Sequence, residues 1–191
     1  GIGTSEVEHV MATQTLILKR SKNLRIDVSG PLGSGVTAKD VALAVIGKIG
    51  TAGGTGSVIE FTGSTFTNLS MEGRMTVCNL SIEMGARGGM IAPDSKTFEY
   101  LKGRAQTPKG ADWDKAMQYW ETLYTEKDAE FDVEFTYDAA DIEPMITYGT
   151  NPGMGMGVTN SIPNAENVEG GVETYKKSLG YMSFSEGDAM I

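Results

Sequence analysis

The sequence predicts a layered α/β domain with a partly parallel sheet. Three short stretches are typical of strands, and two of them, 24–29 and 130–137, alternate apolar and polar residues as half-buried strands do. The third covers 57–62 and follows a glycine tract. Segments with helical periodicity separate these strands. Strands that alternate with helices of about 10–15 residues favour crossover connections and therefore parallel pairing.

The helices are expected where a capping residue precedes an amphipathic run. Thr4 and the residues after it begin a first helix, with Val7, Val10 and Met11 facing inward and Leu18 as a further candidate. A second helix follows Thr37 and ends at the glycine tract. The other helices are predicted over 70–86, from 93–94 onward, over 113–124 and over 172–179. We expect the stretch 146–160 to be irregular, with its methionines packing a mobile loop or contacting a ligand or partner.

Composition excludes several classes of partner. The 191 residues carry a net charge of −9, and eleven carboxylates face only two lysines between Asp112 and Glu143. This acidic run favours a solvated face and is the opposite of the basic surface that binds nucleic acid or anionic membranes. No apolar run approaches the roughly 20 residues that span a bilayer. We therefore expect neither nucleic acid nor membrane as a partner.

Single copies of cysteine and histidine limit the chemistry that the chain can perform. Cys78 is the one cysteine and His9 the one histidine, so no disulfide can form within the chain and no zinc or iron–sulfur ligand set can be assembled. Both are expected to be structural, Cys78 as an inert core cysteine. The glycine tract 50–56 follows a helix and lacks the lysine of a phosphate loop, so nucleotide binding is not expected. The cysteine count suits a cytoplasmic location.

The predicted helix 70–86 carries a polar stripe on an otherwise apolar surface. Glu72, Thr76, Asn79 and Glu83 recur at helical spacing. In one interpretation the stripe faces water, with Glu83 pairing with Arg87. In the other, Asn79 and Glu83 face an internal polar site where a carboxylate acts as acid, base or orienting group. The residues alone leave both open.

Several stretches resemble the large-subunit family of isopropylmalate isomerase (3-isopropylmalate dehydratase), a branch of the aconitase family. They occur in the same order through nearly the whole chain and are specific only in combination. The stretches are 1–16 (GIGTSEVEHVMATQTL), 35–40 (GVTAKD), 52–56 (AGGTG), 69–86 (LSMEGRMTVCNLSIEMGA), 91–94 (IAPD), 100–104 (YLKGR) and 148–153 (YGTNPG).

The resemblance implies a fold, a cofactor and a reaction. The fold is an aconitase-like three-layer α/β/α arrangement with a partly parallel mixed sheet, and the cofactor is a [4Fe–4S] cluster held by three cysteines. The reaction is the hydro-lyase interconversion of 2- and 3-isopropylmalate in leucine biosynthesis, with a separate small subunit completing the active site. Glu83 is similar to the family's active-site glutamate, and Asn79 to its cluster-proximal asparagine. Cys78 matches a family cysteine that does not ligate the cluster.

Residues 1–191 are accordingly expected to be one internal segment of a longer catalytic region. The motifs that hold the cluster would lie outside it, so we expect no metal ligand, no bound cluster and no activity in this segment alone. Two alternatives stay open: a segment of a homoaconitase- or aconitase-type hydro-lyase, and a non-catalytic interaction module of aconitase ancestry.

Overall fold

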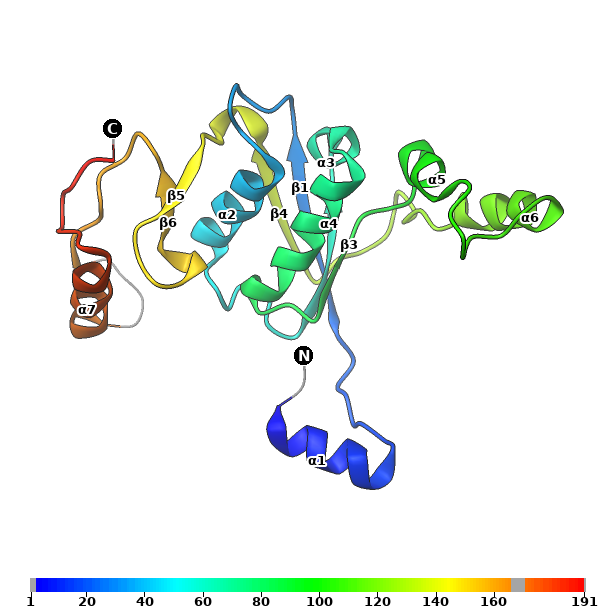
Figure 1. The fold of residues 1–191 in the computed structure, drawn as a ribbon, viewed down its shortest axis with the longest axis horizontal. Helices are drawn as coiled ribbons and strands as arrows, with labels where there is room; N and C mark the ends of the chain where they lie inside the picture. Colours follow the sequence, from blue (N-terminus) through cyan, green and yellow to red (C-terminus); the bar gives the residue numbers. More distant parts are fainter. Residues whose placement is uncertain (1–2, 166–170, 191) are drawn as a thin grey trace.

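A four-stranded parallel sheet forms the centre of the molecule. The computed structural model describes residues 3–165 and 171–190 (Figure 1). The strands are β1 (Lys22–Ser29), β2 (Ser57–Thr62), β3 (Gly88–Met90) and β4 (Val133–Asp138), in the spatial order β3-β2-β1-β4. β1 pairs in parallel with both β2 and β4. The three predicted strands and their parallel pairing are confirmed, although β4 begins three residues later than the predicted stretch 130–137, and β3 was not predicted as a strand.

Two helices cover one face of this sheet. They are α2 (Ala38–Ile49) and α4 (Met71–Leu80), which pack against each other in front of the strands in Figure 1. Leu24, Ile26 and Val28 alternate along β1 with polar residues and are all buried. They join an α2 stripe centred on Val45 and Ile46 in the main core. Burying side chains of this size stabilises the fold by roughly 1.5–3 kcal/mol each.

The opposite face of the sheet is polar. Arg25 and Asp27 on β1 and Glu60 and Thr62 on β2 are half-buried, and Arg25 forms an ion pair with Glu134 on β4. A parallel sheet is ordinarily covered on both faces. The predicted α/β class is confirmed, and among the described residues α2 and α4 lie on one face.

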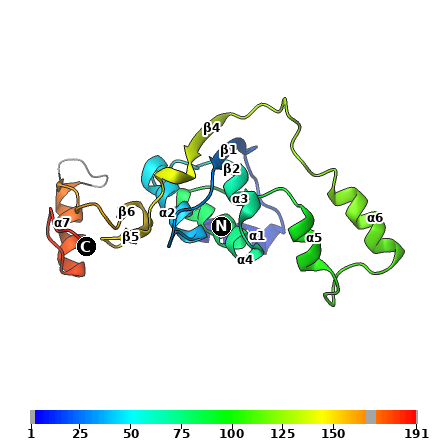
Figure 2. The same cartoon turned by 90° about the horizontal axis from the view of Figure 1, so that it is seen from above.

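The helix α3 (Ser64–Asn68) follows β2 and packs against β1 and β2, with Phe66 buried in the main core. Other elements extend away from the sheet (Figures 1 and 2), and α5 (Ser95–Leu101) and α6 (Ala111–Trp120) project to one side. There Phe98 stacks on Trp120 with ring centroids 5.9 Å apart. On the other side lie α7 (Val172–Met182) and an antiparallel hairpin of β5 (Met145–Thr147) and β6 (Gly155–Gly157). A second, smaller apolar cluster, which includes Tyr148, Tyr175 and Leu179, lies in this part of the chain.

The first helix does not pack as the sequence predicted. α1 (Thr4–Thr13) begins after Gly3, one residue before the expected cap, and none of its ten residues is buried. Val7 is 41% exposed and Met11 76%, and Leu18 beyond the helix is 62% exposed. The expectation of an inward face was therefore wrong for Val7, Met11 and Leu18, while Val10 is half-buried. An apolar stripe shows only that a helix needs a partner, and in the described chain α1 lies away from the core (Figure 1).

Projecting elements give the molecule a large surface. The accessible surface is 11807 Å² for a mass of 20.4 kDa. A compact monomer of that mass exposes roughly 8,800 Å². The excess of about 3,000 Å² is several times the roughly 800 Å² that each partner contributes to a typical stable interface. None of the helices that the structure describes is long and apolar enough to cross a membrane.

Two further boundaries differ from the sequence prediction. The stretch 146–160, expected to be irregular, instead contributes to the β5–β6 hairpin, with the short helix η3 (Pro152–Met154) between its strands. Glycines lack the β-branched side chains that mark strands, which is why the pattern was missed. The helix expected over 113–124 covers Ala111–Trp120. The short helix η2 (Ala139–Asp141) follows β4.

Candidate functional site

The predicted helix 70–86 is two helices of different pitch. Ser70 caps α4, since its Oγ accepts a hydrogen bond from the Gly73 amide at 3.2 Å. The α-helix ends at Leu80 and continues as the 3₁₀ helix η1 (Ser81–Met84). Gly85, with φ +80°, ends it in a conformation that favours glycine. A 3₁₀ helix has three residues per turn, so Glu83 leaves the α-helical register that linked it to Asn79.

Glu83 is exposed, yet it lies on the wall of a hollow of about 640 Å³. Three segments that are distant in sequence meet there: the end of α4 with η1, the start of α2, and the chain from β5 to Pro152. The lining residues are Thr37, Lys39, Asp40, Leu43, Leu80, Glu83, Met145, Ile146, Thr147, Gly149, Thr150, Asn151 and Pro152. We call this hollow the Glu83 pocket. It combines two carboxylates, one ammonium group, hydroxyls and a side-chain amide.

Asp40 joins two walls of the Glu83 pocket. Its Oδ2 accepts hydrogen bonds from the Thr37 amide at 2.7 Å and the Thr37 hydroxyl at 2.6 Å. Its Oδ1 accepts the Met145 amide at 2.7 Å. Burial alone would raise the pKa of Asp40, but these hydrogen bonds outweigh it and hold the pKa below its ordinary value. The sequence pattern predicted Thr37 as a cap but not the role of Asp40, although a carboxylate three residues after a threonine is the pattern of a capping box.

Asn79 is not among the described residues that line the Glu83 pocket. It is exposed on α4, one turn after Met75, and Ile82 follows it on η1; both apolar side chains are nearly half exposed. The structure therefore places Glu83 at a polar hollow and Asn79 on a neighbouring surface that mixes apolar side chains with an amide.

Arg87 does not take the role that the water-facing interpretation gave it. Its guanidinium donates to the Lys19 carbonyl and to the Ser21 hydroxyl, the latter at 3.1 Å. These bonds tie the end of η1 to the segment that leads into β1. Among the described contacts, Arg87 is thus directed away from Glu83.

A buried ion pair that the sequence did not reveal holds α4 in place. Arg74 is 3% exposed and donates to both carboxylate oxygens of Asp94, at 2.8 and 2.6 Å, and to the Thr67 carbonyl at 2.8 Å. The hydrogen bonds from Arg74 hold the pKa of Asp94 below its ordinary value. Asp94 also caps α5 through the amides of Lys96 and Thr97. The arginine on an otherwise apolar edge of the predicted helix was the available signal.

The remaining candidates occupy structural positions. Cys78 packs against the main core, and burial raises the pKa of its thiol, which disfavours the reactive thiolate. His9 lies on exposed α1, with its Nε2 3.5 Å from the Thr15 hydroxyl. Met156 is buried in the smaller apolar cluster and Met154 packs against it. Within the described residues, no three His, Cys, Asp or Glu side chains come together to hold a metal ion.

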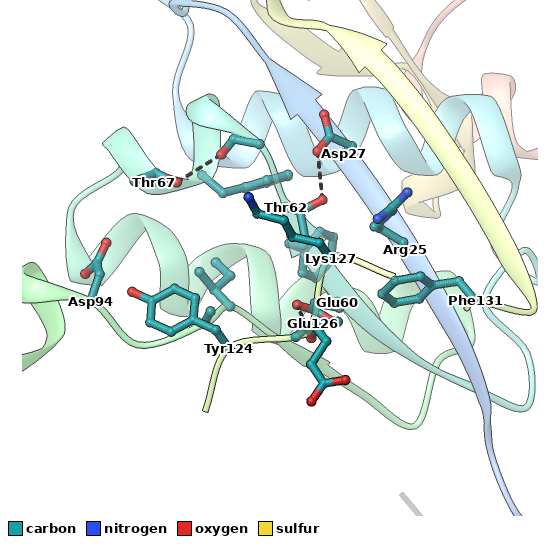
Figure 3. Close-up of a pocket in the computed structure, with 16 residues that line it drawn as sticks. Arg25, Asp27, Glu60, Thr62, Thr67, Asp94, Tyr124, Glu126, Lys127 and Phe131 are labelled. Atoms are coloured by element: carbon teal, nitrogen blue, oxygen red, sulfur yellow. Dashed lines mark hydrogen bonds between the residues drawn. The ribbon is translucent and has the colours of Figure 1, made fainter. Parts of the chain in front are cut away.

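A second hollow, of about 610 Å³, lies on the polar face of the sheet (Figure 3). Its charged groups are largely paired with one another or with neighbours. Asp27 accepts a hydrogen bond from Thr62 at 2.8 Å, and Glu60 accepts the Thr125 hydroxyl with both oxygens. Arg25 pairs with Glu134 and lies over the Phe131 ring. Charged side chains that already have hydrogen-bond or ion-pair partners gain little from binding a ligand. The Glu83 pocket is therefore the stronger candidate site.

Comparison with known proteins identifies the family of the chain. The aconitase family (aconitate hydratase) matches residues 1–190. Proteins called 3-isopropylmalate dehydratase large subunit from Flavobacterium johnsoniae and Bacteroides thetaiotaomicron are 62% and 59% identical to it, and both alignments cover the whole chain. A protein of the same name from Cytophaga hutchinsonii is also 59% identical. The chain spans 41% of the length of each of these relatives. A match over nearly all of its residues shows that the chain belongs to the aconitase family.

Proposed function

We propose that the chain is part of the large subunit of a 3-isopropylmalate dehydratase, the hydro-lyase that interconverts 2- and 3-isopropylmalate in leucine biosynthesis. The observation that carries the proposal is the position of Glu83 on a polar hollow built from three segments, one of which includes residues 149–152 of the 148–153 stretch that resembles that family. The name of the relatives at 59–62% identity supports the choice of substrate. Because the chain spans 41% of their length, activity belongs to the longer protein.

Glu83 is the residue to which we assign proton transfer. Dehydration removes a proton from a carbon next to a carboxylate and a hydroxyl from the neighbouring carbon, and the leaving hydroxyl must be protonated. A solvent-accessible carboxylate on a hollow of this size can reach a bound hydroxy acid and exchange a proton with its hydroxyl oxygen. Lys39 and the hydroxyls of Thr147 and Thr150 provide groups that suit an anionic, hydroxylated substrate.

The family is known to bind a [4Fe–4S] cluster, which supplies a Lewis acid for the substrate hydroxyl when bound. The residues of this chain do not fit the role of cluster ligands. Such ligands are cysteine thiolates, and the chain has only Cys78, whose thiol packs against the core with a raised pKa. We therefore propose that the cluster ligands lie elsewhere in the longer protein, and that this chain alone is inactive.

Asn79 fits the surface that would meet the cluster-bearing part. It is exposed on α4 between Met75 and Ile82. Exposed apolar side chains around a polar group are typical of an interface core. We propose that this face of α4 is covered in the assembled enzyme, with the Asn79 amide directed to the cluster.

A further protein surface completes the enzyme in this proposal. The excess accessible surface of about 3,000 Å² supports burial against more polypeptide, both the rest of the large subunit and a small subunit. The acidic stretch after Asp112 makes nucleic acid and anionic membranes unsuitable partners. A cytoplasmic location is part of the proposal, and the single cysteine suits it.

The proposal is tested with the longer protein, co-expressed with its small subunit and reconstituted anaerobically with iron and sulfide. Conversion of 3-isopropylmalate to 2-isopropylmalate should exceed conversion of citrate or homocitrate by at least about 100-fold in kcat/KM. Preference for one of the other acids would assign the chain to a sister hydro-lyase. In parallel, the 191-residue chain undergoes the same reconstitution, and a stoichiometric [4Fe–4S] absorbance would contradict the proposed absence of ligands.

A further inference from the structure

The wall of the Glu83 pocket opposite η1 is not part of the central sheet. This wall begins at β5 and continues to Pro152. Among the described strands, β5 pairs only with β6, and the two form a small hairpin. A two-stranded hairpin is marginally stable alone. Its position relative to Glu83 therefore depends on what ties it to α2.

Asp40 provides such a tie, because its ionised carboxylate accepts hydrogen bonds from two different elements. One oxygen accepts the two Thr37 donors at the start of α2, while the other accepts the Met145 amide at the start of β5. The carboxylate thus spans 105 residues of sequence. An Asn side chain has one acceptor oxygen, so in Asp40→Asn either the Thr37 amide or the Met145 amide loses its acceptor.

Glu83 itself is held by a different set of contacts. The Gly54 amide donates to the Met84 carbonyl at 2.7 Å, and the Arg87 amide donates to the Ser57 carbonyl at 2.8 Å. These bonds anchor η1 to the turn before β2 and to β2 itself. A change at Asp40 should consequently move the hairpin wall while it leaves the Glu83 wall in place.

We propose that Asp40 is a positioning residue of the Glu83 pocket, which fixes the hairpin wall at the distance from η1 that the substrate requires. The inference rests on the proposed function for what the pocket binds. Its structural half, a tie of the hairpin to α2 through one carboxylate beside the packing of β6 and η3 on α2, stands independently. Asp40 acts through the Met145 amide and the chain that follows it, and it does not exchange protons with the substrate.

The main test is Asp40→Asn in the full-length enzyme with its small subunit. Because the hairpin wall binds substrate and Glu83 stays in place, KM for 3-isopropylmalate should rise about tenfold while kcat changes less than about threefold. Asp40→Glu should recover less than half of the loss, since a longer side chain keeps the charge and alters the spacing. Equal loss in kcat with unchanged KM would overturn a positioning role.

A matched control is available in Asp132, whose carboxylate accepts the Asn23 amide at 2.7 Å across 109 residues. Asp132→Ala removes a long-range tie of the same kind, away from the Glu83 pocket. It should leave KM within about twofold of the unchanged enzyme. A comparable rise in KM for both variants would show that loss of any such tie is sufficient, and would overturn the specific role of Asp40.

Hydrogen–deuterium exchange gives a readout that does not depend on activity. In full-length Asp40→Asn, amides of 145–152 should exchange at least about tenfold faster, with 41–46 and 24–28 unchanged. Unchanged exchange over 145–152 would overturn the inference even if the unsubstituted enzyme proves to be an isopropylmalate dehydratase. Faster exchange over 145–152 in an enzyme that prefers another hydroxy acid would contradict the proposed function alone and support the role of Asp40.

Discussion

The buried pair Arg74–Asp94 makes a quantitative prediction about stability. The Arg74 side chain is 4% exposed and that of Asp94 21%, and two hydrogen bonds at 2.8 and 2.6 Å join them. Asp94→Asn removes the charge while it keeps an amide that caps a helix almost as well. Hydrogen bonds to charged groups contribute about 1.5–3 kcal/mol each, and Asn retains one acceptor. We expect the free energy of unfolding to fall by about 2 kcal/mol at pH 7.

The pH dependence separates this charge effect from a packing effect. Arg74 lowers the pKa of Asp94 in the folded protein below the ordinary value of 3.8. A depressed carboxyl pKa contributes stability that is present above the unfolded pKa and is lost as pH falls through the folded value. The difference between the unsubstituted protein and Asp94→Asn should therefore stay constant from pH 7 to about pH 5 and shrink below about pH 4.

Urea unfolding followed by far-UV circular dichroism at a series of pH values measures both effects. Asp112→Asn is the matched control, because Asp112 pairs with Lys115 at 3.7 Å with both side chains more than three-quarters exposed. Exposed pairs contribute roughly 0–1 kcal/mol. The reasoning fails if Asp94→Asn costs no more than Asp112→Asn, or if its full cost persists at pH 3.

Other predictions follow from single positions. Gly63 has φ +101°, and a Cβ there would clash with the Val28 carbonyl, so Gly63→Ala should lower the free energy of unfolding, measured by urea titration, by more than about 2 kcal/mol. Gly103 has φ +79° with open space around its Cβ position, so Gly103→Ala should lower it by about 1 kcal/mol. Equal losses in the two variants would contradict the clash at Gly63. Cys78 should react with a thiol reagent at pH 8 at least about tenfold more slowly than cysteine in urea-unfolded chain, and a rate equal to the unfolded rate would show that the thiol is accessible. Met11→Ser should leave the thermal midpoint of this chain within about 1 °C, because Met11 is 76% exposed; a large drop would place α1 against the core.

The central sheet could be predicted from sequence because its pattern is local. Leu24, Ile26 and Val28 alternate with polar neighbours, and the strand at 57–62 was located to the residue. Thr37 likewise identified the start of α2, because a cap and its helix are adjacent in sequence. These features depend on periods of two and 3.6 residues and on one capping group.

Other structural features depend on contacts with residues that are distant in sequence, which sequence periodicity does not reveal. The inward face expected for α1 was wrong because the described chain offers it no partner. The break at Leu80 was missed because Ser81 and Ile82 continue the helical pattern, and the change of pitch is set by contacts of Met84 and Ala86 with the turn around Gly54. Asp40 was missed for the same reason, since its second partner, Met145, is 105 residues away.

The candidate site was found by resemblance more than by pattern. The polar stripe left two interpretations open, and only the family motif singled out Glu83 and Asn79. The structure adds that Glu83 lines a polar hollow and that Arg87 is directed elsewhere. The roles of Glu83 and Asn79 remain proposals, to be decided by measurement on the longer protein.

Turnover of the full-length, cluster-loaded enzyme with Glu83→Gln tests the role of this carboxylate most directly, with Glu72→Gln on the exposed surface of α4 as the matched control. Proton transfer by a positioned side chain contributes about 10²–10⁴-fold to a rate, so Glu83→Gln should lower kcat at least about 100-fold while the thermal midpoint stays unchanged. Glu72→Gln should retain kcat within about twofold. Equal turnover in the two variants would remove Glu83 from the reaction.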